Sequence, residues 1–436
     1  MIGSTPLERD GRAISSDASG VSPGDIAVGV VIGRASEYFD YFVYGIASVL
    51  VFPFLFFPFE SRLDGTLYSF AVFSLAFIAR PIGTVVFMEI QRRWGRGTKL
   101  TLALFALGTS TVGIAFLPGY GALGYMAIVL LAVFRVGQGI ALGGSWDGLP
   151  SLLAMSAPPH RRGWYAMMGQ LGAPVGFMLA SGLYLLLYAA LSQEDFLSWG
   201  WRYPFFCAFA INVVALFARL RLVVTDEYTQ LLTDKALEPN RVGELLVSQP
   251  YNVILGAFGA LASYALFHVV TVFPLSWIVL YSKQSVTGFL AIQILAAILG
   301  IGGVVASGVI ADRLGRHKTL GLFATLIAVF SGFAPTLLDG GTLGQDVFVL
   351  IGFGLLGLSY GQAAGALNAS FEPRFRYTGA ALTSDVAWLI GAGFAPLVAL
   401  GLSSYFGLGY VSLYLLSGAA GTLGALWVNR KMAESD

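Results

Sequence analysis

Twelve apolar stretches, each long enough to cross a bilayer, restrict this chain to a helical membrane fold. Crossing the hydrocarbon core takes about 20 apolar residues as a helix, which satisfies every backbone polar group internally. Only 11% of the 436 residues are charged, against about 25% in soluble proteins. We therefore predict an all-α membrane protein of twelve transmembrane helices. The stretches run near residues 27–56, 66–90, 99–117, 122–154, 163–190, 203–222, 252–281, 287–311, 319–338, 346–369, 378–402 and 408–428.

The longest polar break, between the sixth and seventh stretches, divides the predicted helices into two halves of six. The predicted organisation is a cytoplasmic tail at 1–26, a six-helix bundle at 27–222, a cytoplasmic loop at 223–250, a second six-helix bundle at 251–429 and a tail at 430–436. Three short motifs recur at nearly one offset: QRRWGRGTK with DRLGRHK, RVGQGIALGG with SYGQAAGAL, and PPHRRG with EPRFRYTG. Parallel repeats of this kind place a substrate site near the midplane, between the halves.

The distribution of basic residues predicts the orientation. Most of the 25 Lys and Arg residues fall in tails and loops on one side of the predicted helices, and only Arg62, Arg202 and Lys283 fall in loops on the other. Positively charged loops remain in the cytoplasm, so both termini are predicted to be cytoplasmic. The polar segment 1–26 lacks a basic-then-apolar leader, and we expect no cleaved signal peptide.

Other classes of function find little support. The net charge of +1 argues against a nucleic-acid partner. The single cysteine, Cys207, permits no intramolecular disulfide. There is no Walker loop, H-E-x-x-H or C-x-x-C motif and no convincing nucleophile–base set. We predict neither cofactor nor metal, and no enzyme activity.

The loop GVIADRLGRHK (308–318) has the pattern G-x-x-x-D-R-x-G-R-x-K. It resembles the signature loop of the major facilitator superfamily, whose Asp and Arg residues lock neighbouring helices at the cytoplasmic face. The resemblance implies a cytoplasmic latch that includes Asp312, Arg313 and Arg316. A carboxylate such as Asp312 can be satisfied at a helix end by backbone N–H groups or by an arginine.

The N-terminal copy of this loop departs from the pattern. When the two loops are aligned on Gly95, Arg92 stands where the family has Asp. This half of the latch lacks its usual carboxylate, and Glu89 is the residue expected to substitute for it. Arg93 and Arg96 complete the predicted latch in this half.

Several motifs of the N-terminal half resemble those of the metabolite:proton symporters. They are GRASEYFDYFVYG (33–45), ARPIG (79–83), RVGQGIALGGSWDG (135–148), HRRGWYAMMGQLGAPVG (160–176) and WGWRYPF (199–205). The resemblance implies secondary transport in the bacterial inner membrane, driven by the proton gradient. Such relatives take up small organic acids such as 2-oxoglutarate, citrate, shikimate or aromatic carboxylates, and others take up proline and betaine.

Two departures from that family concern charge. Arg34 stands where the family usually has Asn, and Ser145 where it usually has Glu. Asp147 lies two residues further along, about 200° away around an ideal helix. It cannot inherit the role of the missing glutamate unless the helix is distorted.

Charged residues within the predicted helices are the main site candidates, because each costs about 2.5–3.5 kcal/mol at the bilayer centre. Arginine does not release its proton, so a mobile proton must reside on a carboxylate. Breaking an arginine pair during rocking would let that carboxylate take up a proton. The alternative is that the charges form ion pairs that only hold helices together. The candidates for proton coupling are Glu37, Asp40, Asp147 and Asp385.

The predicted substrate contacts combine a helical stripe with polar residues of other spans. Arg34, Glu37, Tyr41 and Tyr44 share one face of the first helix. His268 is a lone membrane histidine that could bind substrate or carry a proton, or simply pack through a hydrogen bond. The predicted substrate-binding residues are Arg34, Tyr41, Tyr44, Arg80, Arg135, Gln138, His268, Gln362 and Asn368.

We predict a monomeric symporter that takes up an organic acid anion together with protons, since interior arginines offer partners for a carboxylate. Three alternatives remain open. The segment GQLGAPVG (169–176) partly resembles an antiporter motif, which allows an exchanger or exporter, although glycine packing also explains it. A zwitterionic osmolyte is a second possible substrate. A sensor that keeps the fold without translocating is the third alternative.

Overall fold

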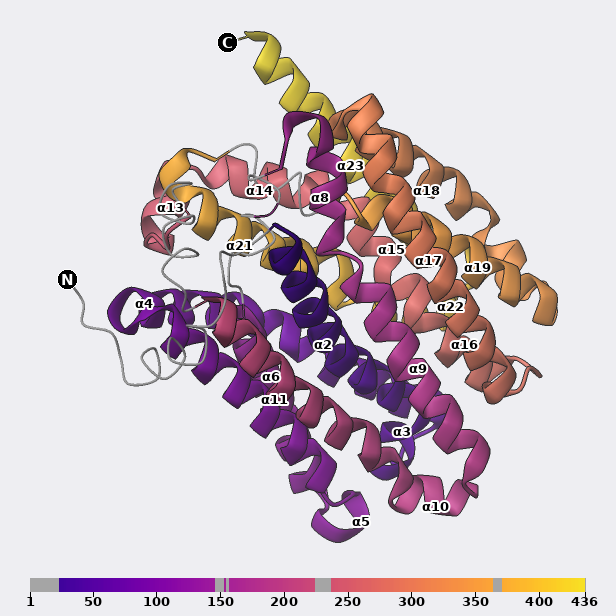
Figure 1. Ribbon diagram of the computed structural model, residues 1–436. Helices are drawn as coiled ribbons and strands as arrows, with labels where there is room; N and C mark the ends of the chain where they lie inside the picture. Colours follow the sequence, from indigo (N-terminus) through magenta and orange to yellow (C-terminus); the bar gives the residue numbers. More distant parts are fainter. Residues whose placement is uncertain (1–22, 146–152, 154–156, 224–236, 364–370, 436) are drawn as a thin grey trace.

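The computed structural model describes residues 23–145, 153, 157–223, 237–363 and 371–435, and within these ranges the ordered elements are all helices. Figure 1 shows the two halves packed against each other, the N-terminal half in indigo to magenta and the C-terminal half in salmon to yellow. The two halves meet along several helices, and the candidate site lies at this junction.

The N-terminal half supplies the first six spans. Its longer helices are α2 (Pro23–Leu50), α4 (Arg62–Phe116), α6 (Tyr125–Gly144), α8 (Arg162–Met168), α9 (Gly172–Ala190) and α11 (Tyr203–Val223). Short helices join or extend them: α3 (Phe52–Leu55), α5 (Tyr120–Leu123), α10 (Gln193–Ser198), and the 3₁₀ turns η1 (Pro159–Arg161) and η2 (Gly200–Arg202). Ser61 caps α4 by accepting a hydrogen bond from the Asp64 backbone N–H, and Ser192 caps α10 in the same way.

The C-terminal half repeats this arrangement. Its helices are α13 (Val242–Ser248), α14 (Pro250–Gly259), α15 (Leu261–Thr271), α16 (Phe273–Tyr281), α17 (Val286–Leu314), α18 (Arg316–Asp339), α19 (Gly341–Tyr360), α21 (Arg376–Ala387), α22 (Ala395–Phe406) and α23 (Gly409–Ser435). The 3₁₀ turn η3 (Pro373–Phe375) precedes α21, and the π-helical turn η4 (Trp388–Gly393) separates α21 from α22. A π-helical turn of this kind often marks a functional position.

The predicted all-α fold with twelve spans is confirmed. Ten described helical segments are long and apolar enough to cross a membrane when α4 is counted once. Gly95 has φ 87° and ψ 172°, which divides α4 into two spans. The charged helix α2 provides the remaining span. The predicted first span, 27–56, is interrupted, because α2 ends at Leu50 and α3 follows as a separate turn.

The two signature loops share one backbone conformation. Gly95 in the N-terminal loop has φ 87°, and Gly315 in the C-terminal loop has φ 81°. Glycine adopts this left-handed region without the penalty that a Cβ atom imposes. The equivalence of the two turns supports the internal repeat inferred from the sequence.

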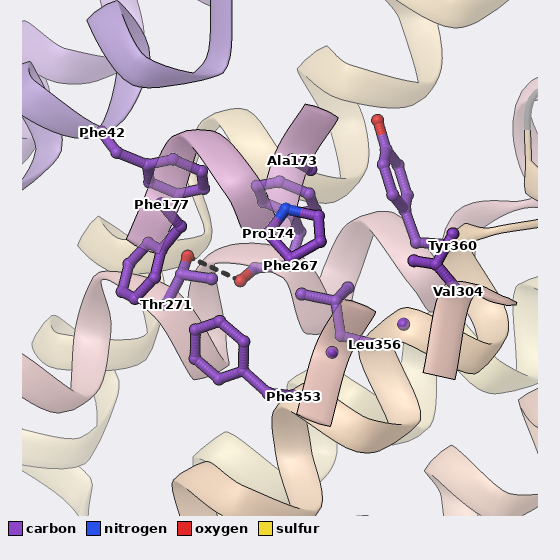
Figure 2. Close-up of a pocket in the computed structure, with 12 residues that line it drawn as sticks. Phe42, Ala173, Pro174, Phe177, Phe267, Thr271, Val304, Phe353, Leu356 and Tyr360 are labelled. Carbon is purple, nitrogen blue, oxygen red and sulfur yellow. Dashed lines mark hydrogen bonds between the residues drawn. The ribbon is translucent and has the colours of Figure 1, made fainter. Parts of the chain in front are cut away.

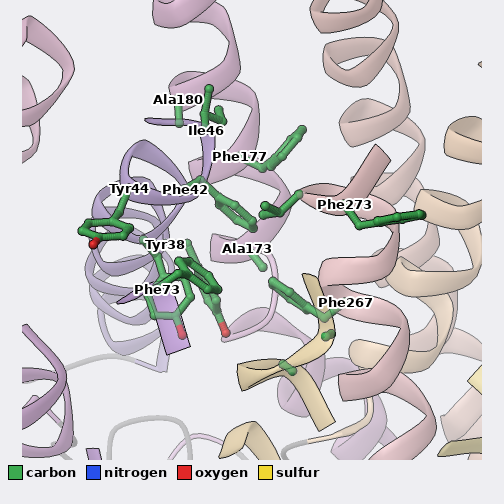
Figure 3. Packing of buried hydrophobic residues seen from close by; sticks show 14 of the residues in the cluster. Tyr38, Phe42, Tyr44, Ile46, Phe73, Ala173, Phe177, Ala180, Phe267 and Phe273 are labelled. Atoms are coloured by element: carbon green, nitrogen blue, oxygen red, sulfur yellow. The ribbon is translucent and has the colours of Figure 1, made fainter. Parts of the chain in front are cut away.

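An aromatic core fills the space between the halves (Figure 3). Phe42 of α2 lies 4.8 Å from Phe177 of α9 and 5.8 Å from Phe267 of α15, measured between ring centroids. Helix α9 packs on α17, and α4 packs on α21, η4 and α22. The halves are therefore in contact through buried rings at the level where a substrate site is expected.

Candidate functional site

Glycines on α6 let this helix approach α4 closely. A Cβ atom at Gly139 would lie 2.3 Å from the carbonyl oxygen of Ala76, and one at Gly143 would lie 2.3 Å from that of Arg80. Neither distance leaves room for a side chain. The close packing brings Arg80 of α4 and Arg135 of α6, both buried, to the interior of the N-terminal half.

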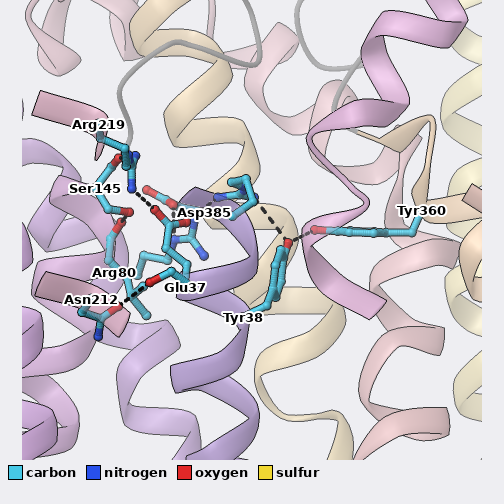
Figure 4. A network of polar contacts seen from close by, with 11 residues as sticks. Glu37, Tyr38, Arg80, Ser145, Asn212, Arg219, Tyr360 and Asp385 are labelled. Atoms are coloured by element: carbon cyan, nitrogen blue, oxygen red, sulfur yellow. Dashed lines mark hydrogen bonds and ion pairs between the residues drawn. The ribbon is translucent and has the colours of Figure 1, made fainter. Parts of the chain in front are cut away.

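One ion pair crosses from one half to the other (Figure 4). The Nε atom of Arg80, on α4, lies 2.7 Å from Oδ1 of Asp385, on α21. The Thr84 hydroxyl, one turn further along α4, donates to the other carboxylate oxygen of Asp385. Within the described ranges this is the one salt bridge that joins the halves. Separating α4 from α21 would expose two charged groups that are now paired and buried.

Glu37 has two arginine partners, both within the N-terminal half. Its Oε2 lies 2.8 Å from Arg34 Nη1 on the same helix, and its Oε1 lies 2.6 Å from Arg219 Nη1 on α11. Arg219 also donates from Nη2 to the Ser145 carbonyl oxygen, at 2.6 Å. These contacts tie α2, α11 and the end of α6 together.

Asp40 is held by neutral donors. Its Oδ2 accepts from Thr111 at 2.7 Å and from the Asn212 amide at 2.8 Å, and its Oδ1 accepts from Gln138 at 3.1 Å. Gln138 in turn accepts a hydrogen bond from Arg135 Nη1 at 3.0 Å. Gln138 therefore connects Asp40 to Arg135, which form no direct ion pair.

The Arg135 guanidinium lies among aromatic rings of its own half. Its central carbon is 4.0 Å from the ring centroid of Tyr44, 4.6 Å from that of Phe73 and 5.2 Å from that of Tyr41. Its Nε donates to the Phe73 carbonyl oxygen at 3.1 Å, whereas its Nη2 has no hydrogen-bond partner. Cation–π contacts of this kind compensate in part for burying the charge.

His268 on α15 faces the same rings from the C-terminal half. Its ring stacks on Tyr41, with centroids 5.8 Å apart and an angle of 5° between the planes. Its Nδ1 lies 3.3 Å from the Thr271 hydroxyl, and its Nε2 has no hydrogen-bond partner. The hydroxyls of Tyr41 and Tyr44 and the Trp388 indole nitrogen are likewise buried without a partner. Buried polar atoms are normally satisfied by protein or water, so this cluster has capacity for water or a polar ligand.

A second polar contact joins the halves beside the ion pair. The hydroxyls of Tyr38, on α2, and Tyr360, at the end of α19, are hydrogen-bonded to each other (Figure 4). Arg34 Nη2 donates to the Tyr38 hydroxyl at 3.3 Å. The Arg34 side chain keeps 15% of its surface exposed, so it is the more accessible arginine of this region.

Comparisons with known proteins identify the family. Residues 26–242 match the model of the family described as "Sugar (and other) transporter". The inner membrane metabolite transport protein YhjE of Escherichia coli K12 is 38% identical over 415 residues, which cover 93% of each chain. The chain belongs to the major facilitator superfamily. It is a multi-pass membrane protein and a secondary transporter of a small molecule, similar to the metabolite:proton symporters. It is not an enzyme.

Further relatives and solved structures agree. The shikimate transporter of E. coli K12 is 32% identical over 407 residues, covering 90% of this chain and 91% of that one. The proline/betaine transporter of Salmonella typhimurium is 27% identical over 386 residues, covering 84% and 75%. The crystal structure of a D-xylose-proton symporter has a TM-score of 0.71 at 19% identity over 92% of this chain and 96% of that chain. The last likeness shows the fold alone.

The C-terminal signature loop of this transporter contacts the N-terminal half. Asp312 accepts hydrogen bonds from the backbone N–H groups of Gly163, at 2.6 Å, and Trp164, at 3.2 Å, in the first turn of α8. Gln362 donates to the Gly163 carbonyl oxygen at 3.2 Å and to Ser307 at 3.3 Å. We call the end of the bundle that holds Asp312 the latch end. The contacts of Gln362 fit the latch better than the predicted substrate contact.

The N-terminal copy of the signature loop contacts the C-terminal half through Gln91, whereas Glu89 was the residue expected. Glu89 pairs with Arg92 at 2.8 Å and Arg93 at 2.7 Å on its own helix, so it does not take the place of the missing carboxylate. Instead, Gln91 accepts hydrogen bonds from Lys99 Nζ at 3.0 Å and from the Tyr377 hydroxyl, in the C-terminal half, at 2.9 Å. The two neighbouring arginines explain why Glu89 is held locally.

The remaining predicted residues lie as follows. Arg96 is half-buried beside the Gly95 turn, with Nη1 lacking a hydrogen-bond partner. Arg313 is exposed, and Arg316 opens α18 behind the Gly315 turn. Asp147 and Asn368 lie outside the described residues. The glycines of the proposed antiporter motif pack on α2, since a Cβ at Gly172 would lie 2.5 Å from Arg34 Cβ.

Sequence reasoning missed several members of the polar network. They are Tyr38, Thr84, Thr111, Asn212, Arg219, Tyr360 and Trp388. A signal was present for two of them: Asn212 and Arg219 are seven residues apart, which places them on one face of α11, whose residues before Arg219 are otherwise mostly apolar. Arg219 instead counted as a basic residue of the cytoplasmic loop, because it stands at the end of its span.

Proposed function

We propose that the protein is a proton-coupled symporter that takes up a small organic acid anion through the bacterial inner membrane by alternating access, as a monomer with both termini cytoplasmic. The observation that carries the proposal is the buried Arg80–Asp385 pair between the halves. Alternating access requires the halves to rock against each other. A proton on Asp385 would remove the charge that holds α4 to α21, and so link proton binding to this motion.

The three described interior carboxylates differ in what protonation would release. Protonation would break the charge pairing of Glu37 with two arginines and would weaken the three hydrogen bonds that Asp40 accepts, all of them within the N-terminal half. Asp385 would lose its ion pair to Arg80, in the other half. We therefore assign proton coupling to Asp385 and give Glu37 and Asp40 the role of holding the N-terminal half together.

The expected substrate charge follows from the donors at the junction. Arg34, Tyr38 and Tyr360 form one group of donors shared by both halves. Arginine binds carboxylates through geometrically matched N–H groups. Two relatives are named as transporters of shikimate and of proline and betaine, and each of these compounds carries a carboxylate group. This supports a carboxylate substrate, and the second name makes a zwitterionic osmolyte the second candidate.

Uptake into proteoliposomes tests the proposal. The panel contains succinate, 2-oxoglutarate, citrate, shikimate, benzoate and betaine, each with and without an inward proton gradient. We expect gradient-driven accumulation of at least one acid by the wild type. Asp385→Asn should abolish this accumulation but retain counterflow, whereas Asp339→Asn, an exposed site, should behave as wild type.

Each other outcome points to a different function. Counterflow that ignores the proton gradient in the wild type would indicate exchange. Accumulation of betaine alone would indicate an osmolyte transporter, and tight binding without flux would indicate a sensor. Loss of counterflow together with accumulation in Asp385→Asn, in protein that remains folded, would move Asp385 from coupling to binding.

A further inference from the structure

An apolar pocket lies between the halves, next to the Tyr38–Tyr360 contact (Figure 2). Its walls come from α2 and α9 of the N-terminal half and from α15, α17 and α19 of the C-terminal half. Because both halves line it, rocking must change its shape. A ligand there would contact both halves at once, as alternating access requires of a substrate.

The walls of this pocket offer almost nothing to a polar group. Phe177 packs against Phe42 at 4.8 Å and Phe353 at 4.9 Å between centroids. The lining has two polar side chains, Thr271 and Tyr360. The Thr271 hydroxyl already donates to the Phe267 carbonyl oxygen at 2.8 Å. A hydroxyl or a second carboxylate placed in the pocket would lose its hydration without gaining a partner.

The other polar lining residue connects the pocket to the donors. The Tyr360 ring lines the pocket, and its hydroxyl points away from Leu356 (Figure 2) to meet Tyr38. Arg34 Nη2 donates to that same Tyr38 hydroxyl. The ring of Tyr360 therefore stands between the apolar pocket and a polar group of two phenols and a guanidinium, of which Tyr38 and Arg34 do not line the pocket itself.

We propose, resting on the proposed organic acid transport, that the substrate is a monocarboxylate with a hydrocarbon body. The carboxylate lies at Arg34, Tyr38 and Tyr360 and replaces the contact between the two phenols. The hydrocarbon body, a ring or a branched chain, lies against Pro174 and Phe353 once rocking has widened the pocket, whose free space in this structure holds little more than a water molecule. The pocket residues thus select against hydroxylated acids and against acids with a second carboxylate.

Gly300 allows a test that leaves the polar group untouched. A Cβ atom at Gly300 would lie 3.4 Å from the Phe353 carbonyl oxygen and 3.6 Å from Pro174 Cβ, which are ordinary contacts. Gly300→Ala should therefore fold while occupying space in the pocket wall. Gly302, exposed on the same helix with nothing within 4 Å of a Cβ, provides the matched control Gly302→Ala.

The probes are two acids with the same ring. Shikimate is a cyclohexene carboxylate with three hydroxyls, and cyclohex-1-ene-1-carboxylate lacks them. Calorimetry on the purified full chain would give both dissociation constants. We expect the apolar acid to bind at least about tenfold more tightly, because buried hydroxyls would lose hydration. Gly300→Ala should weaken its binding by about tenfold, roughly the effect of one methylene in a hydrophobic pocket, and Gly302→Ala should not change it.

A second variant changes the pocket in the opposite direction. Phe353→Leu removes a ring from the wall, and should improve the binding of 4-methylcyclohexanecarboxylate relative to the smaller cyclohexene acid. Thermal unfolding of each variant verifies that it is folded. Equal or tighter binding of shikimate, or equal effects of the two alanine variants, would overturn the proposal.

The outcome also separates this inference from the proposed function. If succinate or citrate binds and is accumulated with the proton gradient while neither ring acid binds, the hydrocarbon-body proposal is wrong and organic acid symport stands. If no carboxylate binds or is transported, organic acid symport fails, and the inference that rests on it fails with it.

Discussion

Arg219 Nη1 lies 2.6 Å from Glu37 Oε1, and this pair joins α11 to α2 inside the N-terminal half. The other terminal nitrogen of Arg219, Nη2, donates to the Ser145 carbonyl oxygen at the end of α6. Ser145 occupies the position where the metabolite:proton symporters usually have glutamate. In this chain a backbone carbonyl therefore satisfies an arginine near the position of the missing carboxylate.

Breaking the Glu37–Arg219 pair on one side should destabilise the protein strongly. Removing one partner of a buried pair typically costs about 3–5 kcal/mol, because it leaves an uncompensated charge. Arg34 still faces Glu37 at 2.8 Å, so we expect the lower end of this range for Arg219→Gln. The measurement is thermal unfolding of the detergent-solubilised variant.

A double-mutant cycle isolates the pair. We expect Glu37→Gln combined with Arg219→Gln to cost little more than either single change, which corresponds to a coupling energy of about 3 kcal/mol, at the upper end of what contacting residues show. Strictly additive costs would show that the two residues act independently and that the contact contributes nothing of its own.

The close packing of α4 and α6 predicts a sharp difference between glycines. A Cβ at Gly143 would lie 2.3 Å from the Arg80 carbonyl oxygen, and backbone atoms cannot move aside as a flexible side chain can. Gly143→Ala should cost at least about 1–3 kcal/mol, the usual range for overpacking. Gly424→Ala, where nothing lies within 4 Å, should leave the yield of folded protein unchanged in size-exclusion chromatography. Normal yields for both variants would mean that α6 can shift.

Segment length and hydropathy predicted the spans of this fold, because the bilayer imposes both on any spanning helix. The same reasoning located Glu37, Asp40 and Arg135 in the interior. It could not predict that Arg80 pairs with Asp385 of the other half. Helices that are apolar on every side give little indication of which face meets which neighbour. Ion-pair partners depend on that rotation and on the packing of distant segments.

The N-terminal latch shows a second reason why the sequence did not predict every contact between the halves. Glu89 was the nearest available carboxylate in the sequence, but its own neighbours Arg92 and Arg93 already pair with it. The contact to the other half comes instead from Gln91, through the Tyr377 hydroxyl. Motif comparison searches for the same chemical group, whereas packing here uses a neutral amide with similar reach.

Because Gln91 and not Glu89 contacts the other half, the two residues of this loop should respond differently to mutation. Tyr377→Phe removes the hydroxyl that donates to Gln91 at 2.9 Å and accepts from Lys99 at 3.1 Å. A buried hydrogen bond contributes about 0.5–1.5 kcal/mol, so the latch end should open several-fold more often. Glu89→Gln should not change the opening, since the ion pairs that Glu89 forms with Arg92 and Arg93 lie within its own helix.

Pulsed electron–electron double resonance would measure how far the latch end opens. Spin labels at Trp94→Cys and His317→Cys, two exposed positions in the signature loops of the two halves, would report their separation. Cys207→Ser removes the native thiol. An equal effect of Tyr377→Phe and Glu89→Gln on the distance distribution would contradict the assignment of the latch contact to Gln91 and Tyr377.

The C-terminal latch should depend on charge rather than on hydrogen bonding alone. Asp312 accepts from two backbone N–H groups in the first turn of α8, where the helix dipole favours a negative charge. Asp312→Asn preserves the size of the side chain and removes the charge. The loss should be about 0.3–2 kcal/mol, and the same spin-label pair should show a larger population with the latch end open. Asp312→Glu should restore part of the closed population, because it restores the charge with a longer reach. If Asp312→Asn and wild type gave the same distance distribution while Asp312→Ala opened the latch end, the contact would depend on hydrogen bonding and the dipole would have no part in it.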